Sequence, residues 1–236
     1  MITFTVHDVI LLGLAIVWVF KGPRWFRYSL HKPLLGFGRG LFLSAPFVVA
    51  GWLVLLAVEG ESIRINRPQE GKFWLLCLGA ALYVALAEEL LLRGILQSFL
   101  ERVFTVRTTL WLQGLTFTLL HIPGHGLAFL QSTFYFLSGV LLTLVLVRWR
   151  NIWTAIGIHF AWDVSAFALQ GFDFRHAKFA GLLEPQRQWV GSLTFTLLIL
   201  IALIILIAAK ETQIALTAGR TYDQGKQLAE VKNGPS

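Results

Sequence analysis

The sequence has 236 residues, of which 56% are hydrophobic and only 14% charged, and its mean hydropathy is +0.68. Soluble domains carry about 25% charged residues, so this composition argues against a soluble protein and favours membrane-spanning helices. The net charge of +7 does not indicate nucleic-acid binding, because the basic residues flank the apolar runs as membrane topology requires. Cys77 is the single cysteine, which excludes an intrachain disulfide.

Apolar runs follow one another along the chain. They cover residues 6–20, 40–58, 72–92, 108–122, 127–147, 152–170 and 189–209. A helix crosses the bilayer with about 20 apolar residues, so the runs predict an all-α, polytopic transmembrane helical bundle of about seven helices, within a range of six to eight. The connections are too short to hold a second core, so residues 1–209 are expected to form a single transmembrane domain. Residues 210–236 are polar and are expected to be a disordered cytoplasmic tail.

Lys and Arg are distributed unequally between the connecting segments. Of the 20 basic residues, 14 lie in residues 21–39, 93–107, 148–151 and after 209, and 6 lie in residues 59–72 and 171–188. Because cytoplasmic segments carry the excess of basic residues, the first set is predicted to be cytoplasmic and the N-terminus to lie outside. We therefore expect an integral multi-pass protein of a bacterial-type cytoplasmic membrane, with its C-terminus in the cytoplasm.

Two adjacent carboxylates, Glu88 and Glu89, interrupt the third apolar run. Each costs about 2.5–3.5 kcal/mol on insertion scales, so carboxylates inside a membrane usually serve a function. In an α-helix Glu89 and Arg93 lie one turn apart and can form an ion pair, whereas Glu88 points about 100° away. Glu88 is therefore the candidate for chemistry. Arg93 could instead serve as an anchor at the cytoplasmic interface.

The segment His121-Ile122-Pro123-Gly124-His125-Gly126 separates the fourth and fifth runs. Pro and Gly predict a helix break, and at membrane depth the freed backbone groups must face protein or a water-filled cavity. His121 lies on the helix before the break and is the candidate partner of Glu88. His125 lies beyond the break and fits the role of a turn residue.

In the sixth run, His159 and Asp163 are four residues apart and share a helix face. A carboxylate one turn from an imidazole can accept its N–H and stabilise the imidazolium. A buried polar pair that joins two helices is the alternative, and this segment alone does not decide between them. Together the three runs supply one carboxylate base and two histidines, which can activate water for attack on an amide and stabilise the oxyanion.

These residues resemble the motifs of the CAAX protease and bacteriocin-processing (CPBP, Abi) family of intramembrane glutamic endopeptidases. The family is marked by Glu-Glu-x-x-x-Arg, Phe-x-x-x-His and His-x-x-x-Asn or Asp, in this order on successive membrane helices. The matching residues occur in the same order within a motif core of about residues 70–170: Glu88-Glu89…Arg93, Phe117…His121 and His159…Asp163.

The resemblance implies that Glu88, assisted by His121, deprotonates a water that attacks the scissile carbonyl. It also implies that His159, with the residue at position 163, stabilises the oxyanion. Many members have Asn where this chain has Asp163. Because Asp supplies no amide donor, we expect Asp163 to orient a protonated His159. The remaining motif residues would support the geometry of the site: Glu89, Arg93 and Phe117.

No cofactor is expected, because the resemblance implies direct glutamate catalysis and the sequence has no His-Glu-x-x-His helix. Two histidines and one glutamate also make a catalytic zinc set. Zinc at Glu88, His121 and His159 therefore stays open as an alternative.

The predicted function is that of an intramembrane endopeptidase. Its partner would be a membrane-embedded polypeptide substrate, either lipidated or carrying a C-terminal anchor, within the lipid bilayer. Processing of prenylated proteins, of secreted peptides and of surface-protein anchors all stay open. A non-catalytic immunity or scaffold protein of the same fold is one alternative. A proton-coupled transporter ranks last, because the sequence has no inverted repeat.

Overall fold

The computed structural model describes residues 13, 28, 30–59, 64–65, 70–125, 128–174, 177–180, 183–184 and 188–208. The predicted first apolar run at 6–20, apart from Gly13, and the predicted tail at 210–236 lie outside the described residues.

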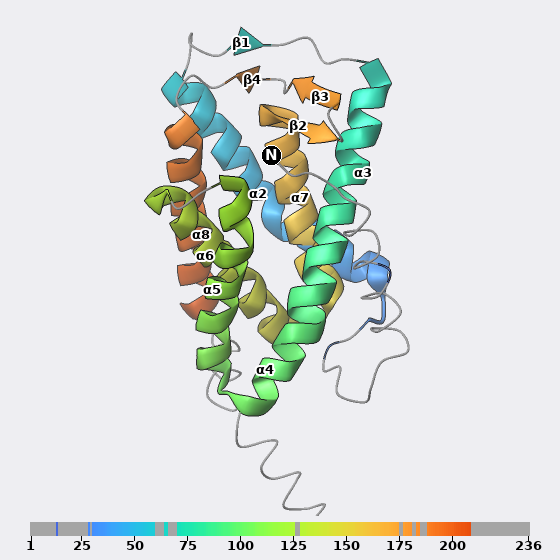
Figure 1. Cartoon of the computed structure of the whole chain (residues 1–236), viewed down its shortest axis with the longest axis vertical. Coiled ribbons are helices and arrows are strands. Elements are labelled where there is room, and N and C mark those ends of the chain that lie inside the picture. Colours follow the sequence, from blue (N-terminus) through green and yellow to red (C-terminus); the bar gives the residue numbers. More distant parts are fainter. Residues whose placement is uncertain are drawn as a thin grey trace, which may run out of the picture.

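The described part of the chain is predominantly helical. Its helices are α2 (Pro33–Glu59), α3 (Glu70–Glu88), η2 (Glu89–Leu96), α4 (Gln97–Val103), α5 (Val106–His125), α6 (Phe129–Trp149), α7 (Ile152–Gln170) and α8 (Gln188–Ala208). The segments α3, η2 and α4 follow one another without a break, so these residues form six continuous helices, which pack side by side in a bundle (Figure 1). The predicted helical class is confirmed.

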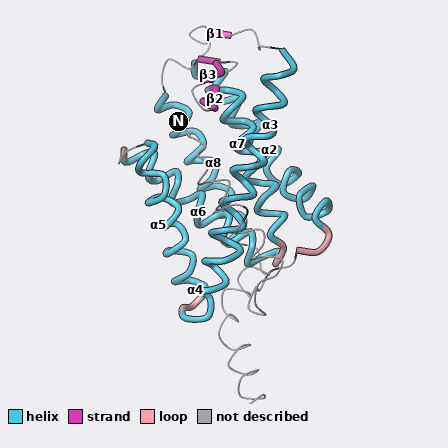
Figure 2. Tube along the Cα trace, turned by 45° about the vertical axis from the view of Figure 1, so that its right-hand side comes forward, coloured by secondary structure: helices cyan, strands magenta, loops and turns pink. Residues whose placement is uncertain are grey.

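Short strands lie at one end of the bundle, which the prediction of an all-α fold did not include (Figure 2). Strand β1 (Arg64–Ile65) pairs antiparallel with β4 (Leu183–Glu184). Strand β2 (Gly171–Phe174) pairs antiparallel with β3 (Ala177–Ala180). All four lie in the segments predicted as connections, 59–72 and 171–188, so they leave the helical core unchanged.

The long helix formed by α3, η2 and α4 extends further than its apolar run. Residues 93–103 were predicted to belong to a connection, and this prediction is wrong, because the helix continues to Val103. The apolar run ends before Arg93 because Arg93 and Gln97 are polar and lower the hydropathy. Both side chains are nevertheless fully buried within the bundle. Hydropathy alone therefore placed the end of this helix too early.

Three described helices are long and apolar enough to cross a membrane: Pro33–Val58, Lys72–Val103 and Phe129–Trp149. They indicate an integral membrane protein. Leu193–Ala208 is a shorter apolar helix. The number of seven crossings and the orientation with the N-terminus outside stay predictions.

A break between the fourth and fifth runs is present, but it lies later in the chain than expected. The prediction that His125 lies beyond the break is wrong, because His125 is the last residue of α5. Helix α5 ends at His125 and α6 begins at Phe129, so Pro123 falls in the last turn of α5. Proline lacks the N–H that would bond the carbonyl four residues earlier, which weakens the helix at this end. The two helices that flank the break pack against each other (Figure 1).

Helices α2 and α7 touch through their backbones. A Cβ on Gly40 would lie 2.8 Å from the Gly157 Cα and would clash with the Thr154 carbonyl oxygen. Small residues at such a crossing let two membrane helices approach closely. Further along the same pair, Trp52 Nε1 donates a hydrogen bond of 2.6 Å to Ser165 Oγ. Helix α7, which carries the predicted His159 and Asp163, is thereby fixed along its length.

Buried polar side chains follow one face of the long helix at intervals of four residues: Glu89, Arg93, Gln97 and Glu101. At its far end Tyr28 donates its hydroxyl hydrogen to Glu101 Oε1, and Gln97 Nε2 donates to the Tyr28 hydroxyl at 2.7 Å. Burial and the Glu101 charge raise the pKa of Tyr28 well above its usual value, so the phenol keeps its proton. Tyr28, which precedes α2 in the chain, is thus bonded to the long helix.

Replacing Gly40 by Ala should lower stability by about 1–3 kcal/mol, because the added methyl has no space between α2 and α7. Gly38 provides the matched control, since a Cβ there meets no atom within 4 Å. Gly38→Ala should leave stability unchanged or raise it by up to about 1 kcal/mol. Thermal unfolding in detergent compares the two, and equal midpoints would contradict the close crossing.

Candidate active site

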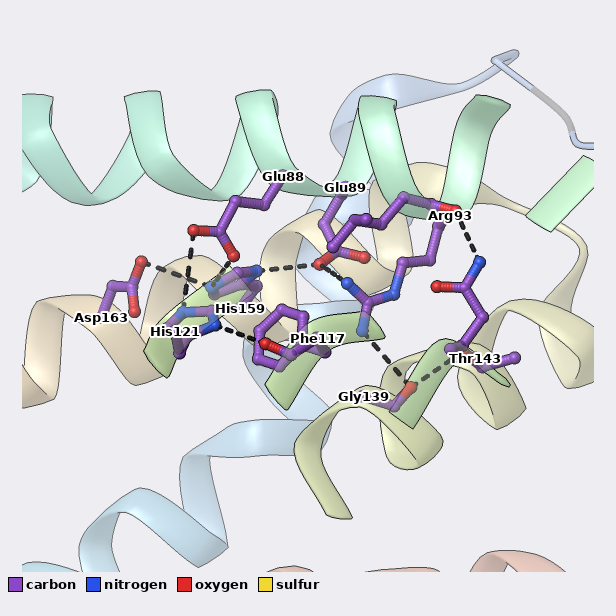
Figure 3. Close-up of polar contacts among 11 residues, drawn as sticks. Glu88, Glu89, Arg93, Phe117, His121, Gly139, Thr143, His159 and Asp163 are labelled. Atoms are coloured by element: carbon purple, nitrogen blue, oxygen red, sulfur yellow. Dashed lines mark hydrogen bonds and ion pairs between the residues drawn. The ribbon is translucent and has the colours of Figure 1, made fainter. Parts of the chain in front are cut away.

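The seven predicted site residues come together inside the bundle (Figure 3). Glu88 is the last residue of α3, Glu89 and Arg93 belong to η2, and the remaining four lie on α5 and α7: Phe117, His121, His159 and Asp163. Their side chains face one another from three separate helices (Figure 3).

Glu89 lies between Arg93 and His159. Its Oε1 atom is 3.2 Å from Arg93 Nη1, and neither side chain of this pair is exposed. The ion pair predicted from their spacing is confirmed. The same oxygen accepts a hydrogen bond of 2.9 Å from His159 Nδ1. Glu89 therefore joins the long helix to α7, a contact that the spacing of its own helix could not predict.

Arg93 makes two further contacts with other helices. Its Nη2 donates to the Gly139 carbonyl oxygen on α6 at 3.3 Å. Its guanidinium carbon lies 4.7 Å from the ring centroid of Phe117 on α5, a cation–π contact. One buried cation thus contacts residues of η2, α5 and α6, which makes Arg93 a central element of the site rather than an anchor at the helix end.

The helix that carries these residues changes geometry at the site. Residues Glu89–Leu96 form a π-helix, where a regular α-helix was expected. Such segments occur frequently at functional sites and leave backbone groups that need other partners. Here the Leu92 carbonyl oxygen accepts both from the Gln97 N–H and from Gln113 Nε2, the latter at 2.7 Å. Gln113, on α5, therefore stabilises the widened turn.

Glu88 is the most exposed member of the cluster, with 28% of its side chain accessible. Its Oε1 lies 3.9 Å from His121 Nε2, and its Oε2 lies 3.9 Å from His159 Nε2. Both distances are too long for a direct hydrogen bond. Glu88 thus stands between two imidazoles without a direct hydrogen bond to either.

His121 has a defined orientation. Its Nδ1 lies 2.7 Å from the Phe117 carbonyl oxygen, one turn earlier on α5. A carbonyl only accepts, so Nδ1 carries the hydrogen of this bond. In the neutral ring, Nε2 then presents its lone pair on the side of Glu88.

Asp163 approaches His159 from the side opposite to Glu89. Its Oδ2 lies 3.5 Å from His159 Nε2, the nitrogen that Glu88 also faces. Within the described residues, neither Asp163 Oδ2 nor Glu88 Oε2 has a hydrogen-bond partner. We expected Asp163 to orient the imidazole. The closer contact, however, is the one that Glu89 makes at Nδ1.

The region of α6 beside the site was not recognised in the sequence. Gly139 supplies a carbonyl to Arg93, and the ring of Tyr135 lies against that of His121. Neither residue carries a charge or matches a motif, so this apolar run, which has no Asp, Glu, Lys, Arg or His, gave no signal. Gln113 was detectable in principle as an amide inside an apolar run.

Among the described residues, no group of three or more His, Cys, Asp or Glu side chains could hold a metal ion.

One family model matches the part of the chain that carries this cluster. Residues 70–165 match the family model described as Type II CAAX prenyl endopeptidase Rce1-like. This segment is an Rce1-like domain. It begins with helix α3 and ends two residues after Asp163, so the Rce1-like domain contains every residue of the cluster. No match was found among curated proteins or among solved structures.

Replacing Glu89 by Gln should destabilise the protein by about 3–5 kcal/mol, because it leaves the buried Arg93 charge without its counter-charge. Glu88→Gln is the matched control, one residue earlier. That side chain is part-exposed and has no close ion pair, so its replacement should change stability by less than about 1 kcal/mol. Thermal unfolding in detergent measures both. A Glu89→Gln protein as stable as the wild type would contradict the structural role of the pair.

Proposed function

We propose that the protein is an intramembrane endopeptidase in which Glu88 activates a water molecule. The observation that carries this proposal is the position of Glu88, whose two oxygens each face the Nε2 atom of a different histidine at 3.9 Å. The match of residues 70–165 to a family of prenyl endopeptidases supports the same reaction class.

The first step forms the tetrahedral intermediate. Glu88 accepts a proton from water while the water oxygen bonds to the scissile carbonyl carbon and the carbonyl electron pair moves to oxygen. His121 assists from the other side of Glu88, with its Nε2 lone pair available to hold or receive a proton. This Nε2 is available because the Phe117 carbonyl engages the opposite nitrogen.

His159 is proposed to stabilise the oxyanion. Its Nδ1–H is bound by Glu89, so Nε2 is the atom that faces the reacting group. As an imidazolium, His159 would donate from Nε2 to the developing negative charge. Asp163, at 3.5 Å from the same nitrogen, would stabilise this charged form before the substrate arrives. The proton held by Glu88 then passes to the leaving amine as the C–N bond breaks.

The substrate class that fits best is a polypeptide with a lipid-modified C-terminus. The matching family is described by its action as a CAAX prenyl endopeptidase. A prenyl group partitions into the bilayer, which brings the adjacent peptide bond to helices that lie in the membrane.

Replacing Glu88 by Gln should lower kcat/KM by at least about 10²-fold, because it removes the general base without changing the shape of the side chain. The assay uses protein in proteoliposomes and a farnesylated peptide with a C-terminal tripeptide to be released. Gly38→Ala, on the open face of α2, serves as the activity control. A Glu88→Gln protein with wild-type activity would show that Glu88 is not the base. Absence of cleavage by the wild type would reject the prenylated substrate.

We propose that hydrolysis needs no metal ion, because Glu88 and the two histidines supply the proton transfers by themselves. Incubation with a zinc chelator should therefore leave the rate unchanged, and metal analysis of the purified protein should find zinc well below one ion per chain. If the chelator abolished activity and added zinc restored it, the zinc alternative at Glu88, His121 and His159 would replace this mechanism.

A further inference from the structure

His121 is held by more than its hydrogen bond to the Phe117 carbonyl. The Phe117 ring packs on the imidazole with 4.6 Å between ring centroids at an interplanar angle of 38°. The Tyr135 ring also contacts the imidazole, with 4.0 Å between centroids at 21°, which is close to a parallel stack. Two aromatic rings and one backbone acceptor thus restrict this side chain.

Tyr135 comes from α6, a helix that supplies no ionisable member of the cluster. Helix α6 reaches the site because α5 and α6 touch at two glycines. A Cβ on Gly139 would lie 2.9 Å from the Gly114 Cα and from the Phe117 Cβ. One turn before Tyr135, Gln131 Nε2 donates to its hydroxyl at 3.4 Å. The phenol is thereby anchored at both its ring and its oxygen.

The orientation of the imidazole decides what His121 can do. With Nδ1–H on the Phe117 carbonyl, Nε2 lies 3.9 Å from Glu88 Oε1. Rotation of the imidazole ring about the Cβ–Cγ bond of His121 would move Nε2 away from Glu88. It would also break the hydrogen bond to the Phe117 carbonyl. A flat ring stacked against the imidazole opposes such a rotation through the overlap of the two faces.

We propose that Tyr135 is a positioning residue of this site: its ring, stacked on His121, holds the imidazole with Nδ1 on the Phe117 carbonyl and Nε2 toward Glu88. The role in turnover rests on the proposed hydrolysis, whereas the role in orienting His121 does not. The ring, rather than the hydroxyl, carries the effect. Tyr135 acts through His121 and is not itself a proton donor in the reaction.

Three variants separate the ring from the hydroxyl. Tyr135→Phe keeps the ring, and Tyr135→Met replaces it by a flexible side chain that can fill the space. Phe129→Met is the control for the same kind of change on α6, where Phe129 is 84% exposed. In the peptide assay, Tyr135→Met should lower kcat at least about tenfold with KM within about twofold, because the reacting groups lose their alignment. Tyr135→Phe and Phe129→Met should retain wild-type kcat.

The second measurement needs no substrate. In protein labelled with nitrogen-15 histidine, the ring signals of the six histidines report which nitrogen carries the proton. The His121 signal is identified by its loss in His121→Gln. In the wild type and Tyr135→Phe it should be that of the neutral ring with Nδ1 protonated. In Tyr135→Met it should shift to the average of the two neutral forms.

A wild-type His121 protonated at Nε2 alone would overturn the inference, whatever the variants do. So would wild-type kcat and an unchanged His121 signal in Tyr135→Met, or a Tyr135→Phe protein as slow as Tyr135→Met. If the signals behave as expected but the wild type cleaves no peptide, the placement of His121 by Tyr135 stands and the proposed hydrolysis falls.

Discussion

The buried ion pair between Glu89 and Arg93 is the constraint on which the rest of the site depends. Both side chains are fully buried, where removing two charges from water is unfavourable unless other groups bond to them. Those groups come from three other helices: His159 on α7, the Phe117 ring on α5 and the Gly139 carbonyl on α6. Satisfying one charged pair therefore fixes the relative positions of four helical segments.

Both residues of this ion pair lie in the π-helix. Its wider turn begins at Glu89, directly after Glu88, and separates the buried carboxylate from the part-exposed one. A widened turn is stable only if its backbone groups find partners, and Gln113 provides one at the Leu92 carbonyl. The buried polar face of the long helix then continues to Glu101, which bonds to Tyr28, so this helix has polar contacts both within its π-helical segment and beyond it.

Glycines bring the helices close enough for short polar side chains to meet. Gly40 and Gly157 bring α2 against α7, and Gly114 and Gly139 bring α5 against α6. The first contact fixes the helix of His159, and the second brings Tyr135 and the Gly139 carbonyl to the site. The two histidines can therefore face Glu88 from opposite helices, although neither bonds to it directly.

The sequence by itself determined the helical class, the presence of a break between α5 and α6, and two contacts between residues four apart: Glu89–Arg93 and His159–Asp163. These follow from helix periodicity, which is local. Only the tertiary structure decided that Glu89 binds His159, that Glu88 stands between two imidazoles, and that Tyr135 stacks on His121. Such contacts join residues far apart in the chain, and they depend on how closely and at what rotation the helices pack, which no single helix encodes.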